Sequence, residues 1–315
     1  MPTSISNGGR IRTNTPAENA YNALFNASQQ IATKQLRLST GKRINTAADD
    51  VAGYVTARSL SSRNGALNTA LKAAGEATNI TSVVQDAYDN IAGLLTQIKD
   101  AAAQASSGAL GTDEKVALAK AAFRLGEQIQ LVADSTVFGG KQLIGGAYTG
   151  SWVVGYTQSN SLLTLDINLA TTNTTQFNVT NAGGFDINAT TGSGVANFAG
   201  VSGLNLKALD SVSDSSLGIF STDNISATLT SLATALNNVN KVAAYVGGIQ
   251  ARIGSQEDLL RSQITNYNAA ISRIQDADVA QEQMDLVRAQ FLQQASLVSL
   301  AQANQNPSAF LQLLR

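Results

Sequence analysis

The sequence predicts a mainly α protein with a β-rich central insert: a long antiparallel helical rod bundle with a β-hairpin, whose terminal helices pair in a coiled coil. Three observations lead to this fold class. No proline interrupts the chain between Ala17 and Asn306, so long helices are permitted. Apolar residues recur at heptad spacing both early and late in the chain. Between these parts, residues 142–206 are rich in Gly, Thr and Asn and carry only two charged residues, Asp166 and Asp186.

The first predicted helix covers residues 15–39. It carries an apolar stripe in which every seventh residue is large, at Leu24, Ile31 and Leu38. Gly41 supplies the stop, because glycine adopts the left-handed conformation that ends many helices. Thr46 and Asp49 then have the spacing of a capping box, which predicts that a second helix begins there.

The second predicted helix runs without a breaker to about Ser106. Roughly 60 residues at 1.5 Å per residue make a helix on the order of 90 Å long. Its apolar residues alternate in steps of four and three, which is the pattern of a coiled-coil seam. The members of this seam are Val84, Tyr88, Ile91, Leu95, Ile98 and Ala102. Thr112 and Asp113 can cap a third helix that reaches about Asp134 and packs antiparallel on the second.

The centre of the chain predicts short strands. Leu163, Leu165 and Ile167 alternate with polar residues, as in a strand with one buried face. We expect a β-hairpin containing Trp152 in its core, followed by a small β or irregular insert to about Gly203. The predicted strands cover residues 151–156, 162–169, 176–180 and 185–187.

Helix returns at Ile225 and carries two further seams with steps of four and three, one over residues 232–246 and one over residues 260–274. A glutamine-rich helix follows over residues 277–303, and we expect residues 304–307 to break it. The simplest closure brings the two chain ends together. The predicted domains are residues 1–45 with 275–315, residues 46–170 with 221–274, and a variable insert over residues 171–220.

The composition excludes several classes of function. The chain has no histidine and no cysteine, which rules out Ser-His and Cys-His catalysis, thiolate metal sites and disulfides. Its net charge is −1, so there is no positive field to hold a nucleic acid or an anionic membrane. No apolar stretch is long enough to span a membrane, and residues 1–10, MPTSISNGGR, show neither the apolar h-region nor the small-residue cleavage site of a signal peptide. We therefore expect no enzyme, no cofactor, no metal ligand, and no nucleic-acid or membrane partner.

Two stretches are specific enough to indicate a family. Residues 38–53 read LSTGKRINTAADDVAG, and residues 272–315 read SRIQDADVAQEQMDLVRAQFLQQASLVSLAQANQNPSAFLQLLR. Both closely resemble the terminal signatures of bacterial flagellin, the subunit of the flagellar filament. The likeness covers about residues 20–145 and 225–315. The first fifteen residues depart from the usual flagellin start by an extra Gly-Gly-Arg.

The resemblance implies a non-enzymatic, secreted subunit that polymerises with copies of itself, or with other flagellins, into an extracellular filament for swimming motility. It further implies export through the flagellar type III channel without a cleaved signal peptide. The implied partners are an export chaperone that wraps the carboxy-terminal helix, a filament cap protein and hook-associated proteins. The terminal helices would line the core of the filament, and the variable centre would face solvent.

The carboxy-terminal segment favours such a role for a physical reason. Residues 289–314 contain no charge and few large apolar groups, so they make a poor solvent-exposed helix and a poor independent core. We expect neighbouring copies to complete this helix. The expected subunit-interface residues are Leu24, Ile31, Arg43, Asp49, Arg288, Phe291, Leu292, Leu297, Leu300, Leu311 and Leu314.

A possible receptor face lies within residues 95–104, LTQIKDAAAQ. The resemblance places there the helix that the vertebrate Toll-like flagellin receptor reads. The matching positions are Gln97, Ile98, Lys99, Asp100 and Gln104. Gln97 stands where recognised flagellins have an arginine, and Ala101 where they have a leucine. Loss of these two anchors predicts weakened receptor binding.

Two other functions share parts of this pattern. A hook–filament junction protein would have the same helical plan but would not grow long polymers. A secreted adhesin or host-signalling ligand would place its function in residues 146–220. Self-assembly separates the first alternative from a filament subunit, and deletion of the insert separates the second.

Overall fold

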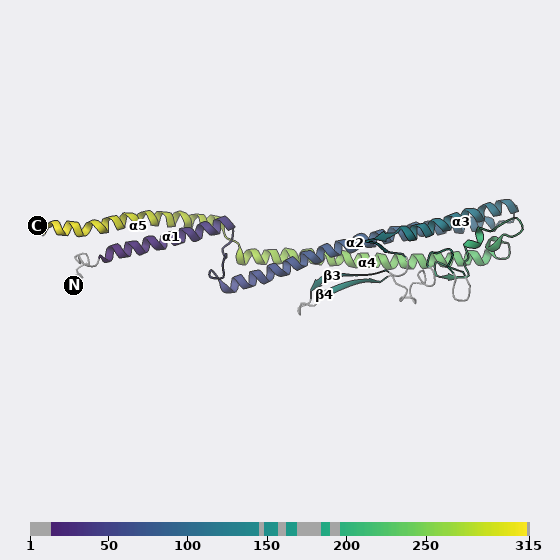
Figure 1. The fold of residues 1–315 in the computed structure, drawn as a ribbon, viewed down its shortest axis with the longest axis horizontal. Helices are drawn as coiled ribbons and strands as arrows, with labels where there is room; N and C mark the ends of the chain where they lie inside the picture. The colour runs from purple at the N-terminus through teal and green to yellow at the C-terminus, as the bar shows by residue number, and fades with distance from the viewer. Residues whose placement is uncertain (1–13, 145–147, 157–161, 169–183, 190–195, 314–315) are drawn as a thin grey trace. The chain divides into compact units, whose positions relative to one another are not determined.

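A computed structural model describes residues 14–144, 148–156, 162–168, 184–189 and 196–313 of the chain (Figure 1). The chain divides into two compact units. One unit contains Met1–Gly65 and Thr265–Arg315, and the other contains Ala66–Ile264. The three-part division expected from the sequence stays a prediction.

The described residues confirm a mainly α fold. The helices are α1 (Thr15–Thr40), α2 (Val51–Ala105), α3 (Thr112–Ser135), α4 (Ile225–Gln275) and α5 (Val279–Leu313). Asn14 caps α1, because its side-chain oxygen accepts a hydrogen bond of 3.2 Å from the backbone N–H of Ala17. Gly41 ends α1 with a φ of 68°, as expected.

Two expected helix boundaries are wrong. Helix α2 begins at Val51 and not at Thr46, because the Asp49 carboxylate accepts hydrogen bonds from the backbone N–H groups of Asn45 and Thr46 and holds a turn before the helix. Asp50 caps α2 instead, accepting from the N–H of Gly53 at 3.0 Å. Helix α5 continues through the expected break, since Pro307 removes only one backbone donor near the helix end.

The strands form three separate antiparallel pairs. Strand β3 (Thr149–Tyr156) pairs with β4 (Leu162–Asn168), which confirms the predicted hairpin. The two short pairs are β1 (Val137–Phe138) with β2 (Lys141–Gln142), and β5 (Asn197–Phe198) with β6 (Val201–Ser202). Gly139 and Gly140, both with positive φ, make the two-residue turn between β1 and β2.

The strand expected over residues 185–187 is absent. These residues form turns, because the Asp186 side chain accepts from the backbone N–H of Asn188 and its carbonyl accepts from the N–H of Ala189. Short 3-10 helices follow at Lys207–Leu209 and Gly218–Phe220. The strand expected over residues 176–180 lies outside the described residues.

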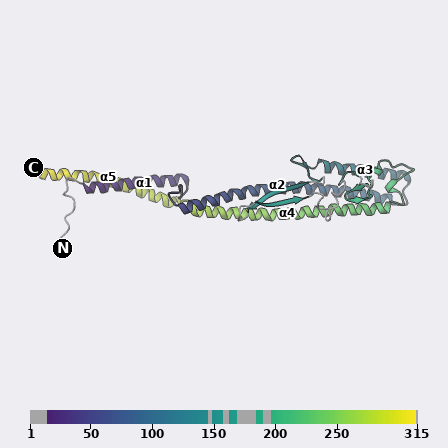
Figure 2. The same ribbon diagram turned by 60° about the horizontal axis from the view of Figure 1, so that its bottom comes forward.

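The core of the Ala66–Ile264 unit lies between α2 and α4, which run antiparallel and side by side (Figures 1 and 2). All six residues of the predicted α2 seam are buried, which confirms it. On α4, every seventh residue is buried, at Leu232, Val239, Val246, Ile253 and Leu260. The Phe185 ring packs between Tyr88 of α2 and Phe198 of β5, with ring centres 6.4 and 6.0 Å away.

Candidate functional site

The Met1–Gly65 and Thr265–Arg315 unit is built around an antiparallel pair of α1 and α5, here called the terminal pair (Figures 1 and 2). Both helices present a heptad seam to each other. The most deeply buried seam residues are small: Ala20 and Ala27 on α1, and Ala289, Ser296 and Ala303 on α5. Small side chains allow the two helix backbones to approach closely.

Polar contacts also join the two helices of the terminal pair. The Asn14 side-chain amide donates to the carbonyl of Ala303 at 2.8 Å, so one residue caps α1 and contacts α5. Farther along, the Gln293 amide donates to the Ser28 hydroxyl at 3.2 Å. These contacts satisfy polar groups that the closely packed backbones would otherwise strip of water.

A cluster of four charged residues, here called the charged cluster, lies nearer the end of α1. The Lys34 ammonium is 2.8 Å from Glu282 and 2.7 Å from Asp285. The Arg37 guanidinium is 3.2 Å from the other carboxylate oxygen of Glu282. The Glu282 side chain is only 9% exposed, so its charge depends on these two cations.

The cluster shifts the pKa values of Lys34 and Asp285. Burial alone would lower the pKa of Lys34. The hydrogen bonds and charges of Asp285 and Glu282 outweigh burial, so the pKa of Lys34 lies above its usual value of 10.5. The hydrogen bond from Lys34 holds the pKa of Asp285 below 3.8. Both shifts favour the charged forms, which is expected of a formed ion pair.

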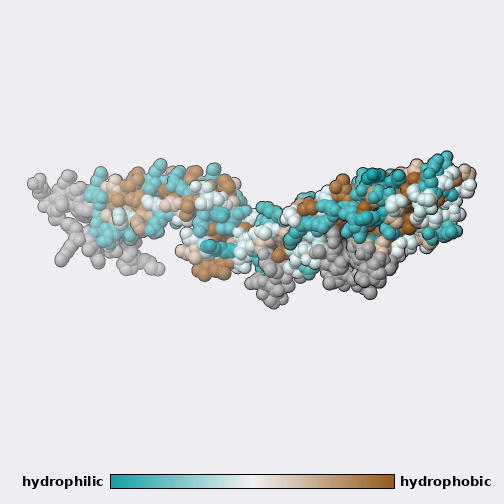
Figure 3. All heavy atoms as spheres, turned by 45° about the vertical axis from the view of Figure 1, so that its right-hand side comes forward, coloured by the Kyte–Doolittle hydropathy of each residue, from teal (hydrophilic) through white to brown (hydrophobic). Residues whose placement is uncertain are grey.

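The outer surface of the terminal pair carries large apolar side chains, here called the terminal apolar face. On α5, Phe291 is 70% exposed and Val298 is 71% exposed. The face comprises Tyr21, Phe25, Leu36, Met284, Val287, Phe291, Leu292, Leu297 and Val298. Figure 3 shows hydrophobic residues, in brown, among hydrophilic ones on the visible surface of the terminal helices.

The terminal pair therefore reverses the usual arrangement of a soluble coiled coil. Alanine and serine are the most deeply buried residues of its seam and Leu24, Ile31 and Leu300 are only half-buried there, whereas Phe291, Val298 and other large apolar side chains lie outside. Burial of small side chains removes little apolar area from water, so the pair gains little stability by itself. An exposed apolar surface of this kind marks an interaction site.

The structure distributes the expected interface residues over three environments. Leu24, Ile31 and Leu300 are half-buried in the seam. The exposed residues on α5 are Arg288, Phe291, Leu292 and Leu297. Leu311 belongs to α5, but its side chain and all of Leu314 lie outside the described part of the chain.

Arg43 and Asp49 lie in the segment between α1 and α2. The Arg43 guanidinium donates to the carbonyl of Ile274 at 2.9 Å, and its backbone N–H donates to the carbonyl of Gln275 at 2.7 Å. Both side chains are exposed. In a single copy, the hydrogen bonds of Arg43 and Asp49 hold the segment between α1 and α2 in place. The exposed parts of both side chains remain accessible to solvent.

The residues of the expected receptor face do not all share one surface. Gln97, Asp100 and Gln104 are exposed and follow one another at helical spacing on α2. Lys99 is half-buried. Ile98 is fully buried in the helical core, so it is not presented on that face.

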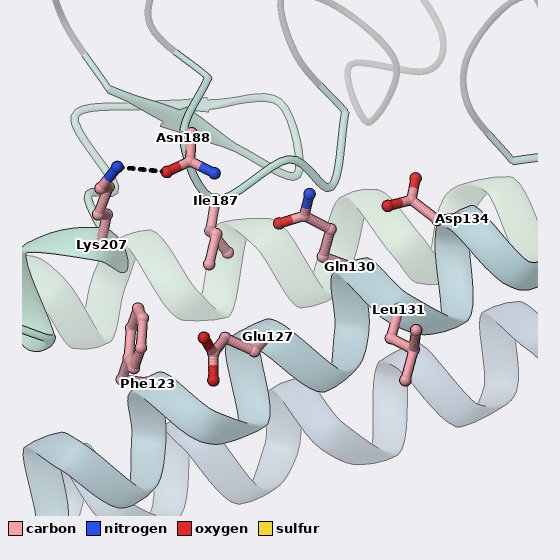
Figure 4. A pocket seen from close by; sticks show the side chains of 8 residues that line it. All are labelled: Phe123, Glu127, Gln130, Leu131, Asp134, Ile187, Asn188 and Lys207. Atoms are coloured by element: carbon pink, nitrogen blue, oxygen red, sulfur yellow. Dashed lines mark hydrogen bonds between the residues drawn. The ribbon is translucent and has the colours of Figure 1, made fainter.

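An open groove of about 440 Å³ runs along α3 (Figure 4). Its lining residues include Phe123, Glu127 and Leu131 of α3, and the Lys207 ammonium at its edge donates to the Asn188 side chain at 2.6 Å. The groove brings together no nucleophile and base. Within the described ranges, no cluster of three or more metal-ligating side chains occurs, and no helix there has the length and hydrophobicity to cross a membrane.

The expected interface residues did not include the charged cluster or six of the nine residues of the terminal apolar face, namely Tyr21, Phe25, Leu36, Met284, Val287 and Val298. The signal for Tyr21 and Phe25 was present, because both lie off the heptad stripe of the first helix. The signal for the charged cluster is weaker, since Lys34 and Asp285 are 251 residues apart in the chain. Only the pairing of the two ends brings these charges to one level.

Comparison with known proteins agrees with this geometry. Residues 11–149 match the bacterial flagellin N-terminal helical region, and residues 229–314 match the C-terminal helical region. The flagellin of Bacillus subtilis (strain 168) is 28% identical over 97% of this chain and 100% of its own length. Polar flagellin F of Vibrio parahaemolyticus is 25% identical over 96% of this chain and 99% of its own. The flagellin of Halalkalibacterium halodurans is 26% identical, with 97% and 99% covered.

Proposed function

The chain belongs to the bacterial flagellin family, and we propose that it builds the flagellar filament by polymerising through its terminal helices into a helical tube. Flagellins are structural proteins, and this chain is a structural subunit of an extracellular flagellar filament. The hook–filament junction and adhesin alternatives are not favoured, since the relatives are flagellins over nearly their whole length.

The terminal apolar face is the observation that supports this route of assembly. Phe291, Leu292 and Leu297 on α5 are exposed in the single chain and have no further element of the same chain to cover them among the described residues. A surface that contacts a different surface on the next copy repeats without closing, which gives an open helical polymer. Assembly then stabilises the terminal pair by mass action.

The expected interface residues take distinct parts in this proposal. Phe291, Leu292 and Leu297, together with Arg288, contact neighbouring copies directly. Arg43 and Asp49 contact a neighbour from the junction between α1 and α2. The proposed division has residues 1–45 with 275–315 lining the filament core, residues 46–170 with 221–274 outside them, and residues 171–220 facing solvent.

The same apolar surface explains the partners proposed before assembly. A chain whose α5 exposes Phe291 and Val298 would aggregate in the cell, so an export chaperone that covers α5 is needed. Export without a cleaved signal peptide, growth under a cap protein and contact with hook-associated proteins complete the proposal. A host flagellin receptor would contact Gln97, Lys99, Asp100 and Gln104, and the missing arginine and leucine make this contact weak.

Electron microscopy of the purified protein, concentrated and seeded with short filament fragments, tests the proposal. We expect long tubes of uniform diameter that dissociate on dilution. A matched sample lacking residues 279–315, and hence α5, should stay monomeric under the same conditions. Short capped stubs, or no polymer at all from the full chain, would contradict the proposed function.

A further inference from the structure

The charged cluster separates its charges by helix. Both cations, Lys34 and Arg37, lie on α1, and both anions, Glu282 and Asp285, lie on α5. Three ion pairs of 2.7 to 3.2 Å therefore join the helices at one level of the terminal pair. Such a distribution favours α1 against α5 over either helix against itself.

The rest of the seam does not make this distinction. Alanine occupies the most buried seam positions of both helices, at Ala20 and Ala27 on α1 and at Ala289 and Ala303 on α5. An alanine seam accepts any helix that presents another alanine seam. Two α1 helices, or two α5 helices, could therefore pack together as closely as α1 and α5 do.

Like-with-like pairing brings like charges together at the charged cluster. In a parallel pair of identical helices, two copies of α1 would bring Lys34 and Arg37 against identical cations. In the same parallel arrangement, two copies of α5 would leave the nearly buried Glu282 facing another carboxylate without Lys34 and Arg37. Removing one partner of a buried pair leaves an uncompensated charge in a site of low polarity, which is strongly unfavourable.

We propose that the charged cluster is the partner-specificity element of the terminal pair: it makes α1 pair with α5 and prevents pairing with an identical helix of another copy. The inference rests on the proposed function in one respect, because polymerisation brings the terminal helices of many copies together. When these helices are crowded together, a seam that does not distinguish α1 from α5 would let a helix pair with the identical helix of another copy. The specificity comes from repulsion between like charges in the wrong pair as much as from attraction between opposite charges in the right pair.

A thiol-specific cross-link reports the pairing directly. The chain contains no cysteine, so Ser28→Cys with Gln293→Cys introduces the only two thiols. The Gln293 amide donates to the Ser28 hydroxyl at 3.2 Å across the terminal pair, so correct pairing within one copy places the two thiols within the span of a short bismaleimide cross-linker. Mispaired copies give cross-linked dimers instead. The two products separate on a denaturing gel.

Three variants in this background test the proposal. The first reverses α1 (Lys34→Glu with Arg37→Glu), the second reverses α5 (Glu282→Lys with Asp285→Lys), and the third carries all four changes. We expect each two-site reversal to slow the intrachain cross-link at least tenfold. The four-site variant restores opposite charges and should recover the original rate. An equimolar mixture of the two reversed chains should form cross-linked dimers that neither chain forms alone.

Two controls keep the result interpretable. Arg124→Glu breaks the 2.7 Å ion pair with Glu127 on α3, in the other unit, and should leave the cross-link unchanged. The fluorescence of Trp152, the one tryptophan, reports that the Ala66–Ile264 unit stays folded. Polymerisation is measured separately by sedimentation, so loss of assembly with a normal cross-link counts against the proposed function alone.

The proposal is overturned if both reversed chains cross-link at the original rate, since the seam and the junction would then choose the partner. It is also overturned if the four-site variant does not recover, or if the unreversed chain gives no intrachain cross-link in either monomer or polymer.

Discussion

Replacement of Phe291 by alanine tests the terminal apolar face most sharply. Phe291 is 70% exposed in the single chain. Since an aromatic side chain buries about 150–250 Å², about 140 Å² of Phe291 is open to a neighbouring copy. At about 25 cal/mol per Å², burial of this area contributes about 3.5 kcal/mol, of which alanine retains a part. The expected loss is about 2 kcal/mol per subunit in the polymer, which is about 30-fold in an equilibrium constant.

Sedimentation of polymer at a series of concentrations measures this loss as a rise of about 30-fold in the critical concentration. The free energy of unfolding of the monomer should change by less than about 0.5 kcal/mol, because an exposed side chain contributes little there. Phe291→Leu keeps most of the apolar area and serves as the matched control, for which we expect only a small rise in the critical concentration. An unchanged critical concentration for Phe291→Ala, or a monomer that is destabilised as much as the polymer, would refute the reasoning.

Three further predictions concern the core, the hairpin and the ion pairs. Ile98→Ala empties a fully buried seam position, so urea unfolding of the monomer should show a loss of about 2–5 kcal/mol; a loss under about 1 kcal/mol would mean that the position is not packed. Gly150→Ala places a methyl group against the Trp152 ring and should shift its fluorescence emission, whereas an unaltered spectrum would contradict the close approach. The Asp285 ion pair stabilises the terminal pair above pH 3.8 and is lost as the pH falls below that value, while the Lys34 contribution is lost only above pH 10.5. The helical circular dichroism should therefore weaken in acid and persist at pH 9, and a signal unaffected in acid would argue against this linkage.

The long helices could be predicted because their signal is local and repeated. Val84, Tyr88 and Ile91 follow a spacing that only a helical seam explains, and the structure buries all three. The hairpin of β3 and β4 was predictable for the same reason, from strict alternation. Both signals extend over enough residues to outweigh the ambiguity of any single position.

Short signals were less reliable. The spacing of Thr46 and Asp49 fits a capping box, but it equally fits a turn held by the Asp49 carboxylate, and the turn is what forms. Residues 185–187 look like a strand by composition, yet Asp186 and Asn188 favour turns through side-chain to backbone hydrogen bonds. In each case a single polar side chain decided between two local structures.

The site depends on which residues face each other across the two chain ends, which no local pattern reveals. The uncharged run of α5 predicted that this helix needs partners. It did not show that alanines would fill the seam and leave Phe291 and Val298 outside. Nor did it show that Lys34 would meet Glu282, because each residue alone has the character of an ordinary charged surface residue.

Amide hydrogen exchange of α1 and α5, compared between dilute monomer and assembled filament, addresses the central claim most directly. The amides of residues 15–40 and 279–305 should exchange rapidly in the monomer and slowly in the filament, while those of α2 over residues 84–102 stay protected in both. Equal, strong protection of the two terminal helices in the monomer would contradict the account, because they would then need no neighbour to complete them.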